Sequence, residues 1–371
     1  MKFEVEQEMF SKFLSSLLGA VPTKTTTPIL SHLALAVEGK KLRCVGTDLE
    51  IAVSRDTEEI HAVEEGGVTI PAKKFAEVVG VFPVGKIRIS ADAKSRVEIR
   101  SGKSEVTLTG GSREDYPSIP SVGEEITFSL GADRLARLLD VTTFAAGTDE
   151  IRSFLNGANF ALEEKTLRVV STDGHRLAFA EEELAKAPKG LGAKTSSVVV
   201  PLKALREVRR LLPEKGNVVV TIAGNQASFA WPGVSIVSRL IAEPFPNYET
   251  VIPKKTTKEA EVDGAALAAA LSRALPIVEA KSNSVRLAFS SKAVRVSAEA
   301  SEVGTFKEDV PVSYKGDNLE IAFNARFLLD YLRTIPDAQP LRIELNEAAN
   351  PAVLKCGEKS KDFYVVMPMR V

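Results

Sequence analysis

The chain has 371 residues and a formal net charge of −1, from 48 basic and 49 acidic side chains. This balance lacks the strong basic excess of a conventional duplex-binding domain, so any surface for nucleic acid must gather its positive charge locally. The sequence has no apolar run near the roughly 20 residues that cross a bilayer, no signal-peptide core, and only two distant cysteines. We therefore expect a soluble cytoplasmic protein in a reducing compartment.

The first third of the chain alternates helical and strand patterns. Residues 8–21 carry apolar side chains at steps of three and one, which predicts an amphipathic helix. Residues 33–37 and 40–43 predict a β-hairpin that turns at Glu38-Gly39. A second helix is expected between Pro71 and Pro83, because proline lacks an N–H and stops a helix. Residues 106–108 indicate an edge strand.

The same order of patterns recurs twice more. First helices are predicted from Ala132 and from Asp263, with Asp133 and Asp263 as N-caps. The hairpins recur with turns at Glu163-Glu164 and Ser290-Ser291, and the second helices lie within 201–213 and 324–336. A spacing kept at intervals of roughly 125 residues indicates triplication of one unit. We expect an α+β architecture with domains at 1–122, 123–255 and 256–371.

The sequence offers little for catalysis. Its three histidines, His32, His61 and His175, have no metal-ligand spacing, and it has neither a phosphate-binding glycine loop nor a nucleophile elbow. Asp48 and Asp173 occupy equivalent positions, and they support one rival hypothesis, a metal-dependent phosphoryl hydrolase. The simpler interpretation is a turn aspartate that recurs because the unit recurs. We therefore expect a protein that is not an enzyme and that has no catalytic residue, no metal and no cofactor.

Two further patterns each allow a structural and a functional interpretation. Basic residues recur on the predicted helices, as solvated helix faces or as a surface that faces phosphates; their recurrence at equivalent positions favours the second interpretation. The stretch 364–370 is apolar and rich in methionine. It is either a closing strand in the core or the lining of an adaptable groove, because unbranched thioethers repack around different ligands.

Several motifs together resemble one known family, the bacterial sliding clamp or beta subunit of DNA polymerase III. They are Met1-Lys2-Phe3, Pro28-Ile29-Leu30, Gly46-Thr47-Asp48-Leu49-Glu50, Leu155-Asn156-Gly157, Thr172-Asp173-Gly174-His175-Arg176-Leu177, Phe245-Pro246-Asn247-Tyr248 and Tyr364 to Arg370. The match spans essentially the whole chain. The resemblance implies the DNA clamp fold: a head-to-tail homodimeric ring of six similar domains, each with two helices facing the hole and antiparallel sheets outside.

The resemblance also implies a function and its partners. The ring would encircle double-stranded DNA without sequence preference and confer processivity by tethering the replicative polymerase. Its other partners would be the clamp-loader complex, translesion polymerases, and mismatch-repair and ligase proteins, all docking through short linear peptide motifs. A second rival is an open, non-specific DNA-binding scaffold, which would bind linear and circular DNA alike.

Three sets of site residues follow from the resemblance. The DNA contacts would be Lys24, Lys73, Arg152, Lys203 and Arg210, and the dimer interface would join Lys74, Val78, Val106 and Leu108 of one subunit to Ile277 and Val278 of the other. The sequence departs from the family at Thr250, where some clamps have arginine, and at Ser153-Phe154, which replaces a tyrosine pair. The peptide pocket would comprise Leu155, Thr172, Gly174, His175, Arg176, Leu177, Pro246, Val251, Val365, Val366, Met367, Pro368, Met369 and Arg370.

Overall fold

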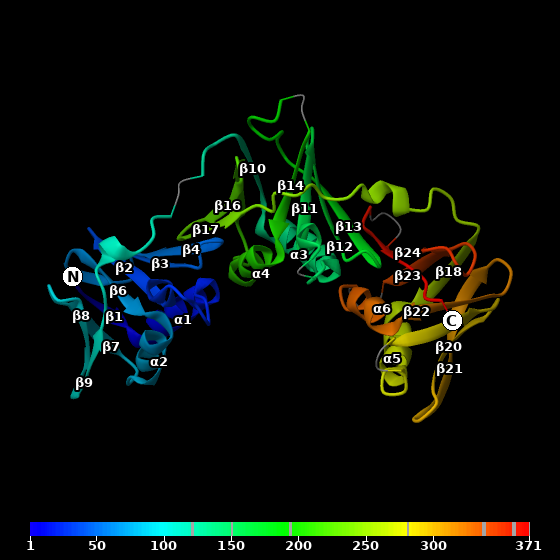
Figure 1. The fold of residues 1–371 in the computed structure, drawn as a ribbon, viewed down its shortest axis with the longest axis horizontal. Coiled ribbons are helices and arrows are strands. Elements are labelled where there is room, and N and C mark those ends of the chain that lie inside the picture. Colours follow the sequence, from blue (N-terminus) through cyan, green and yellow to red (C-terminus); the bar gives the residue numbers. More distant parts are fainter. Residues whose placement is uncertain are drawn as a thin grey trace. The chain divides into compact units, whose positions relative to one another are not determined.

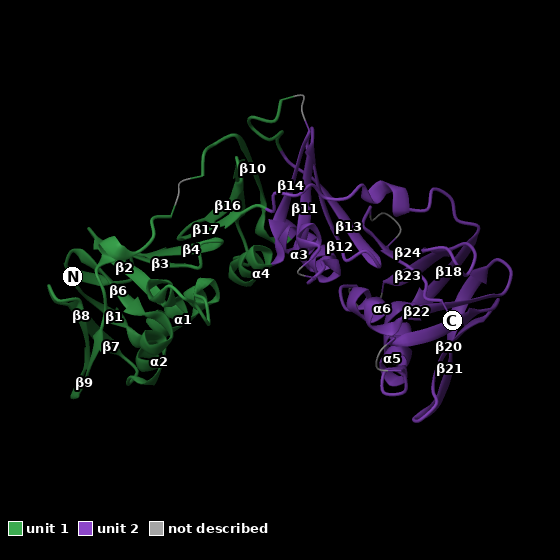
Figure 2. Cartoon of the chain, in the orientation of Figure 1, with its two compact units in different colours: residues 1–133, 186–192, 203–240 green, residues 134–185, 193–202, 241–371 purple. Residues whose placement is uncertain are grey.

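The structure, a computed structural model, describes residues 1–119, 122–149, 151–192, 195–279, 282–335, 339–357 and 361–370. The chain forms two compact units (Figure 2): unit 1 contains residues 1–133, 186–192 and 203–240, and unit 2 contains residues 134–185, 193–202 and 241–371. Within the described residues, no helix is long and apolar enough to span a membrane.

Unit 1 contains two antiparallel sheets with helices α1 (Gln7–Leu17) and α2 (Ala72–Val81), and it includes residues 203–211 of α4 (Leu202–Leu211) (Figure 1). Its core forms where α1 meets α2 and the first sheet, because the ring of Phe10 lies 5.8 Å from those of Phe3 and Phe75. The first sheet has the order β5 (His61–Glu64), β1 (Lys2–Glu6), β7 (Lys86–Ala91), β8 (Arg96–Ser101) and β9 (Ser104–Thr109). The second has the order β10 (Ile126–Gly131), β15 (Asn217–Ala223), β16 (Gln226–Trp231), β17 (Val234–Arg239), β4 (Ile51–Thr57), β3 (Lys41–Thr47), β2 (His32–Glu38) and β6 (Gly66–Pro71).

Unit 2 is built on one antiparallel sheet, with helices α3 (Ala132–Thr142), α5 (Gly264–Ala274) and α6 (Ala325–Leu332). In its core Tyr331 of α6 stacks on Tyr364, with ring centroids 4.9 Å apart. The sheet has the order β14 (Ser196–Pro201), β11 (Gly157–Glu163), β12 (Thr166–Thr172), β13 (Arg176–Glu183), β25 (Phe363–Val366), β24 (Ala352–Cys356), β23 (Pro340–Leu345), β18 (Lys258–Asp263), β21 (Gly304–Lys315), β20 (Ala293–Ala300), β19 (Ser284–Phe289) and β22 (Leu319–Asn324).

The predicted helices and hairpins are present. Asp263 caps α5, since its carboxylate accepts hydrogen bonds from the N–H groups of Ala265 and Ala266 at 2.8 and 3.0 Å. The prediction that Asp133 is an N-cap was wrong, because α3 begins at Ala132 and Asp133 lies inside its first turn. Each of the three hairpins turns one residue later than expected. Glu38 pairs with Lys41, Glu163 pairs with Thr166, and the N–H of Ser290 bonds to the carbonyl of Ala293.

Two predicted positions lie outside the described residues. They are Pro336, the expected stop of the third repeat's second helix, and Ser121, beside the expected first domain boundary. The three domain boundaries themselves stay predictions. The α+β class is confirmed, with every strand pair in the described part of the chain antiparallel.

Candidate functional site

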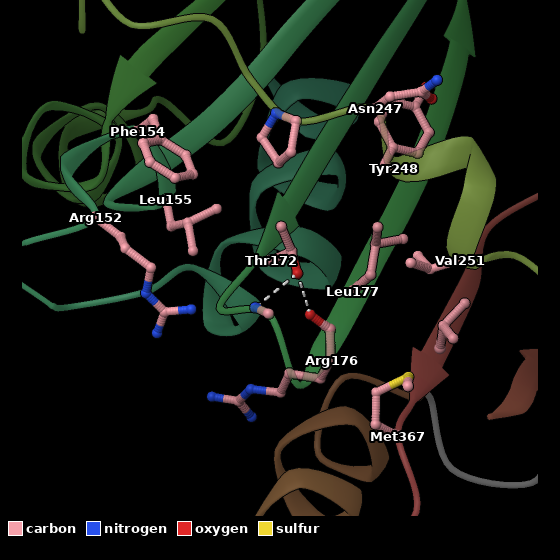
Figure 3. A pocket seen from close by; sticks show the side chains of 13 residues that line it. Arg152, Phe154, Leu155, Thr172, Arg176, Leu177, Asn247, Tyr248, Val251 and Met367 are labelled. Carbon is pink, nitrogen blue, oxygen red and sulfur yellow. Dashed lines mark hydrogen bonds between the residues drawn. The ribbon is translucent and has the colours of Figure 1, made fainter. Parts of the chain in front are cut away.

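Unit 2 contains a pocket of about 280 Å³ (Figure 3). Short segments from four parts of the chain form its walls: the 3-10 helix Ser153–Leu155, the turn between β12 and β13, residues 246–251, and the stretch that follows β25. The pocket is lined by Arg152, Phe154, Leu155, Thr172, Gly174, Arg176, Leu177, Pro246, Asn247, Tyr248, Val251, Val365 and Met367. Its mixture of apolar walls and a few polar groups is typical of a ligand site.

The turn from Thr172 to Arg176 is held by its own side chains. Asp173 Oδ1 accepts hydrogen bonds from the N–H groups of His175 and Arg176 at 2.9 and 3.0 Å. Thr172 Oγ1 accepts from the N–H of Gly174 at 3.1 Å and donates to the carbonyl of Arg176 at 2.6 Å, as Figure 3 shows. Gly174 has φ +90°, a conformation that other residues rarely adopt. The rim of the pocket is therefore fixed before any ligand arrives.

Arg176 joins this turn to α6. Its guanidinium donates to Asp173 at 2.9 Å, to Asp330 at 2.7 Å and to the carbonyl of Phe144 at 2.9 Å. It also lies over the ring of Phe327, 4.3 Å from the centroid. Burial lowers the pKa of Arg176, but the hydrogen bond to Asp330 and the charges of Asp173 and Asp330 outweigh that effect and raise the pKa overall. The side chain is thus a fixed cation beside the pocket.

The pocket floor continues into an apolar cluster on one face of the sheet. Leu177 and Val365 pair across β13 and β25, and they pack with Val170, Phe179 and Val353. Phe179 stacks on Phe363 with centroids 4.5 Å apart, and Tyr248 covers the pair, its ring 6.3 Å from that of Phe179. Burial raises the pKa of Tyr248. The floor is therefore a set of packed rings and aliphatic side chains.

Part of the predicted pocket lies elsewhere. Val366 points to the opposite face of the sheet and is buried in the main core, because neighbouring side chains alternate along a strand. Beyond Pro368 the backbone N–H of Met369 bonds to the carbonyl of Ala322 at 2.8 Å, which carries the chain away from the pocket. The lining of this pocket does not include His175, Val366, Pro368, Met369 or Arg370, and their part in binding a peptide stays a prediction. Only the backbone carbonyl of His175 helps, by accepting a 2.9 Å bond from the N–H of Met367.

Four lining residues were missed. Asn247 and Tyr248 belong to a motif that carried the resemblance, whereas Phe154 lies where the sequence departs from the family. Their positions beside Pro246 and Leu155 were the available signal. Arg152 was assigned to DNA, yet its side chain also lines the pocket and donates to Asp149 at 3.2 Å.

The predicted DNA contacts differ in whether an acidic side chain already pairs with them. Lys24 and Lys73 are exposed and form no ion pair with another residue in the described ranges. Lys203 instead pairs with Asp48, and Arg210 pairs with Glu207 while donating to the carbonyl of Ser16 at 2.6 Å. Because Ser16 lies in the last turn of α1, Arg210 ties α4 to that helix end.

The predicted dimer residues lie mostly at accessible positions. β9 is an edge strand of its sheet, as expected, and Val106 and Leu108 are half-buried on the same face of it. Ile277 is partly buried against the core of unit 2. Val278 is 8% exposed and belongs to that core, and its place in a dimer interface stays a prediction.

The structure also bears on the aspartates of the rival hypothesis. Asp48 Oδ1 accepts from the N–H groups of Glu50 and Ile51 at 2.9 and 2.8 Å, the same turn that Asp173 forms. Each carboxylate is thus engaged in its own turn, as the simpler interpretation expects. In the described residues, no group of three or more His, Cys, Asp or Glu side chains could hold a metal ion.

Comparison with known proteins shows the family. Models for the N-terminal, central and C-terminal domains of the DNA polymerase III beta subunit match residues 1–120, 129–247 and 249–370. The beta sliding clamps of Pseudomonas aeruginosa and Escherichia coli K12 are each 32% identical to this chain, over 372 and 373 residues that cover 100% of both proteins in each comparison. The chain belongs to the DNA polymerase III beta-subunit family and consists of three tandem domains of that family.

Solved structures agree with this assignment. The DNA polymerase III subunit beta of Pseudomonas aeruginosa matches with a TM-score of 0.92 and 32% identity, covering 100% of both chains. The sliding clamp of Bacillus subtilis matches with a TM-score of 0.94 and 26% identity, covering 100% of this chain and 99% of the other.

Proposed function

We propose that this protein is a DNA sliding clamp: two copies close head to tail into a ring that encircles duplex DNA and confers processivity on the replicative polymerase. The observation that carries the proposal is the full-length match to three successive beta-subunit domains. We take each domain to present its two helices to the hole and its sheets to the outside. The ring performs no chemistry, and its partners in replication and repair bring their own.

A near-zero net charge suits this function. A protein that neutralises many phosphates binds tightly, and its affinity falls steeply with salt. A closed ring needs only enough positive charge to keep DNA centred, because topology retains it. The exposed Lys24 and Lys73 are our leading candidates for phosphate contact, and Lys203, Arg210 and Arg152 would have to leave or share their carboxylate partners.

The pocket in unit 2 would dock the partners. A short peptide in extended form would place aliphatic side chains against Leu177 and Val365, while polar groups meet the fixed rim at Thr172 and Arg176. The replicative polymerase, the clamp loader, translesion polymerases, and mismatch-repair and ligase proteins would compete for this pocket. Only one partner could then occupy it at a time.

Retention on circular DNA tests the clamp. The protein is loaded by a bacterial clamp-loading ATPase complex onto nicked circular DNA and then moved to high salt. It should stay bound, since salt screens phosphate contacts but cannot open a closed ring, and one double-strand cut should release it. An open scaffold would leave intact circles and linear DNA equally fast, and that result would sink the proposal.

A pair of methionine variants tests the pocket. A Gln- and Leu-rich peptide of the polymerase type should bind with about −7 to −8 kcal/mol, a micromolar affinity. Met367→Ala removes a lining side chain and should weaken binding about tenfold, which corresponds to ~1.4 kcal/mol of lost contact. Met9→Ala is the matched control, because Met9 lies in α1 of unit 1 and does not line the pocket. Equal affinities of the two variants in calorimetry would contradict this use of the pocket.

A further inference from the structure

Unit 1 contains a second hollow, a groove of about 530 Å³ that no part of the proposed function uses. It lies over strands β3, β4, β17 and β16 and beside residues 116–119. Tyr116 fixes that wall, because its hydroxyl donates to the carbonyl of His32 and accepts from the N–H of Thr47, both at 3.1 Å. Burial raises the pKa of Tyr116 to about 12, which keeps the phenol protonated as a donor.

The groove is the internal counterpart of the pocket in unit 2. In unit 1, Ala52 pairs with Val237 and Ser54 with Ser235; in unit 2 the same register pairs Leu177 with Val365 and Phe179 with Phe363. The ends of these strands also correspond. The N–H of Arg239 bonds to the carbonyl of Glu50 at 2.9 Å, and in unit 2 the N–H of Met367 bonds to the carbonyl of His175 at 2.9 Å. Pro117 stands where unit 2 has Pro246.

The two sites differ in what fills the sheet face. Unit 2 covers its face with the stacked rings of Phe179 and Phe363, and unit 1 has serine at both positions. A third apolar side chain of unit 2 is also replaced by serine in unit 1. Ser228 pairs with Val237 at the position where Val353 pairs with Val365 in unit 2. Replacing two phenyl rings by hydroxymethyl groups leaves space that the backbone, held by the same pairing, cannot close.

The polar groups of the groove define a complementary ligand. The hydroxyls of Ser54, Ser228 and Ser235 are half-buried and form no hydrogen bond with another residue in the described part of the chain. Arg43 is already neutralised by a two-point contact with Asp56 at 2.9 and 3.0 Å. Arg113 is different: its pairing with Glu38 is longer, 3.3 Å, and both side chains are well exposed. Such a surface pair is weak and is readily exchanged.

We propose that this groove binds a short peptide segment of a partner protein in which a tyrosine or phenylalanine lies close to an acidic residue. The aromatic ring occupies the space above Ser54 and Ser235 that phenylalanine fills in unit 2, and a tyrosine hydroxyl bonds to the serines. The acidic side chain replaces Glu38 on Arg113. The site is separate from the pocket of unit 2, so it adds a second class of partner and does not depend on the clamp function.

Methyl NMR on the full-length protein tests the proposal with defined probes. Acetyl-Glu-Ala-Tyr-amide should shift the methyl signals of Val45 and Val237 in a saturable way. Acetyl-Lys-Ala-Tyr-amide should bind about tenfold more weakly, because it lacks the charge-assisted bond to Arg113. Arg113→Glu should reverse that preference. Signals of Val251 and Val365 in the other pocket serve as the internal reference.

A filling variant provides the second test. Ser54→Phe combined with Ser235→Phe copies the ring pair of unit 2 and should abolish the shifts at Val45 and Val237, while leaving the unit 2 pocket able to bind its peptide. If that variant does not fold, the surface variant Arg113→Glu still decides. The proposal is overturned if neither peptide shifts Val45 and Val237, if both bind equally well, or if the shifts persist in the filled protein.

Discussion

The side chain of Arg176 allows a quantitative test of what holds the pocket rim to α6. Its guanidinium is 10% exposed and donates to Asp173, Asp330 and the carbonyl of Phe144. Removing one partner of a buried ion pair costs ~3–5 kcal/mol, because the other charge is left uncompensated. Asp330 is 30% exposed and can be rehydrated in part, which favours the lower end. We therefore expect Arg176→Ala to destabilise this region by about 3 kcal/mol.

Hydrogen exchange of the full chain is the suitable assay, because it reports the stability of β13 and α6 separately from that of the rest of the chain. Amides of β13 and α6 should lose protection by about 3 kcal/mol in Arg176→Ala and by about half of that in Arg176→Lys, which keeps the charge but not the planar fork. Asp330→Asn is the matched control, since an amide oxygen still accepts the bond. Protection in Arg176→Ala within about 1 kcal/mol of the wild type would refute the reasoning.

Three further outcomes are expected. Leu108→Lys and Ile277→Asp, made in separate proteins, should each sediment as monomers, because each buries a charge in an apolar contact; dimers in both would place the interface elsewhere. Lys24→Glu should hinder loading onto DNA without changing thermal stability. Arg210→Glu should also lower the stability of unit 1, because Arg210 bonds to the end of α1. Equal melting temperatures of the two variants would contradict this difference. Burial lowers the pKa of His32 below its unfolded value, so the stability it contributes is lost as pH falls through the folded pKa. His32→Gln should therefore make the melting temperature depend less on pH between about pH 7 and 5. An unchanged slope of melting temperature against pH would exclude His32 as the cause.

The sequence predicts a helix or a cap correctly where one local rule determines it. The apolar stripes predicted α2, α4 and α6, because a helix must bury one face. Pro83 and Pro213 marked where α2 and α4 stop, because proline ends a helix. Asp263 was placed correctly as a cap, but Asp133 was not, because one residue of shift moves a carboxylate from the cap into the first turn. Helix ends are the least certain part of such predictions.

The pocket shows why site residues are harder to predict. The alternation along β25 places Val365 and Val366 on opposite faces of the sheet, and this separation follows from the sequence alone. Tyr248 packs on Phe179 from a distant segment of the chain, a contact that no local pattern encodes, and Phe154 lines the pocket beside Leu155. The backbone bond of Met369 to Ala322 of β22 likewise joins two segments that only the folded chain brings together.

The position of β25 has a consequence for how the protein is made. This four-residue strand lies between β13 and β24, and it is the last strand of its sheet to be synthesised. Roughly 180 residues separate β13 from it, so a ribosome adding ~5–20 residues per second needs about 10–40 s to supply it. Until then the edge of β13 that β25 will cover is unpaired, and such an edge recruits other chains. Nascent chains of this protein should therefore depend on chaperones until translation passes residue 366.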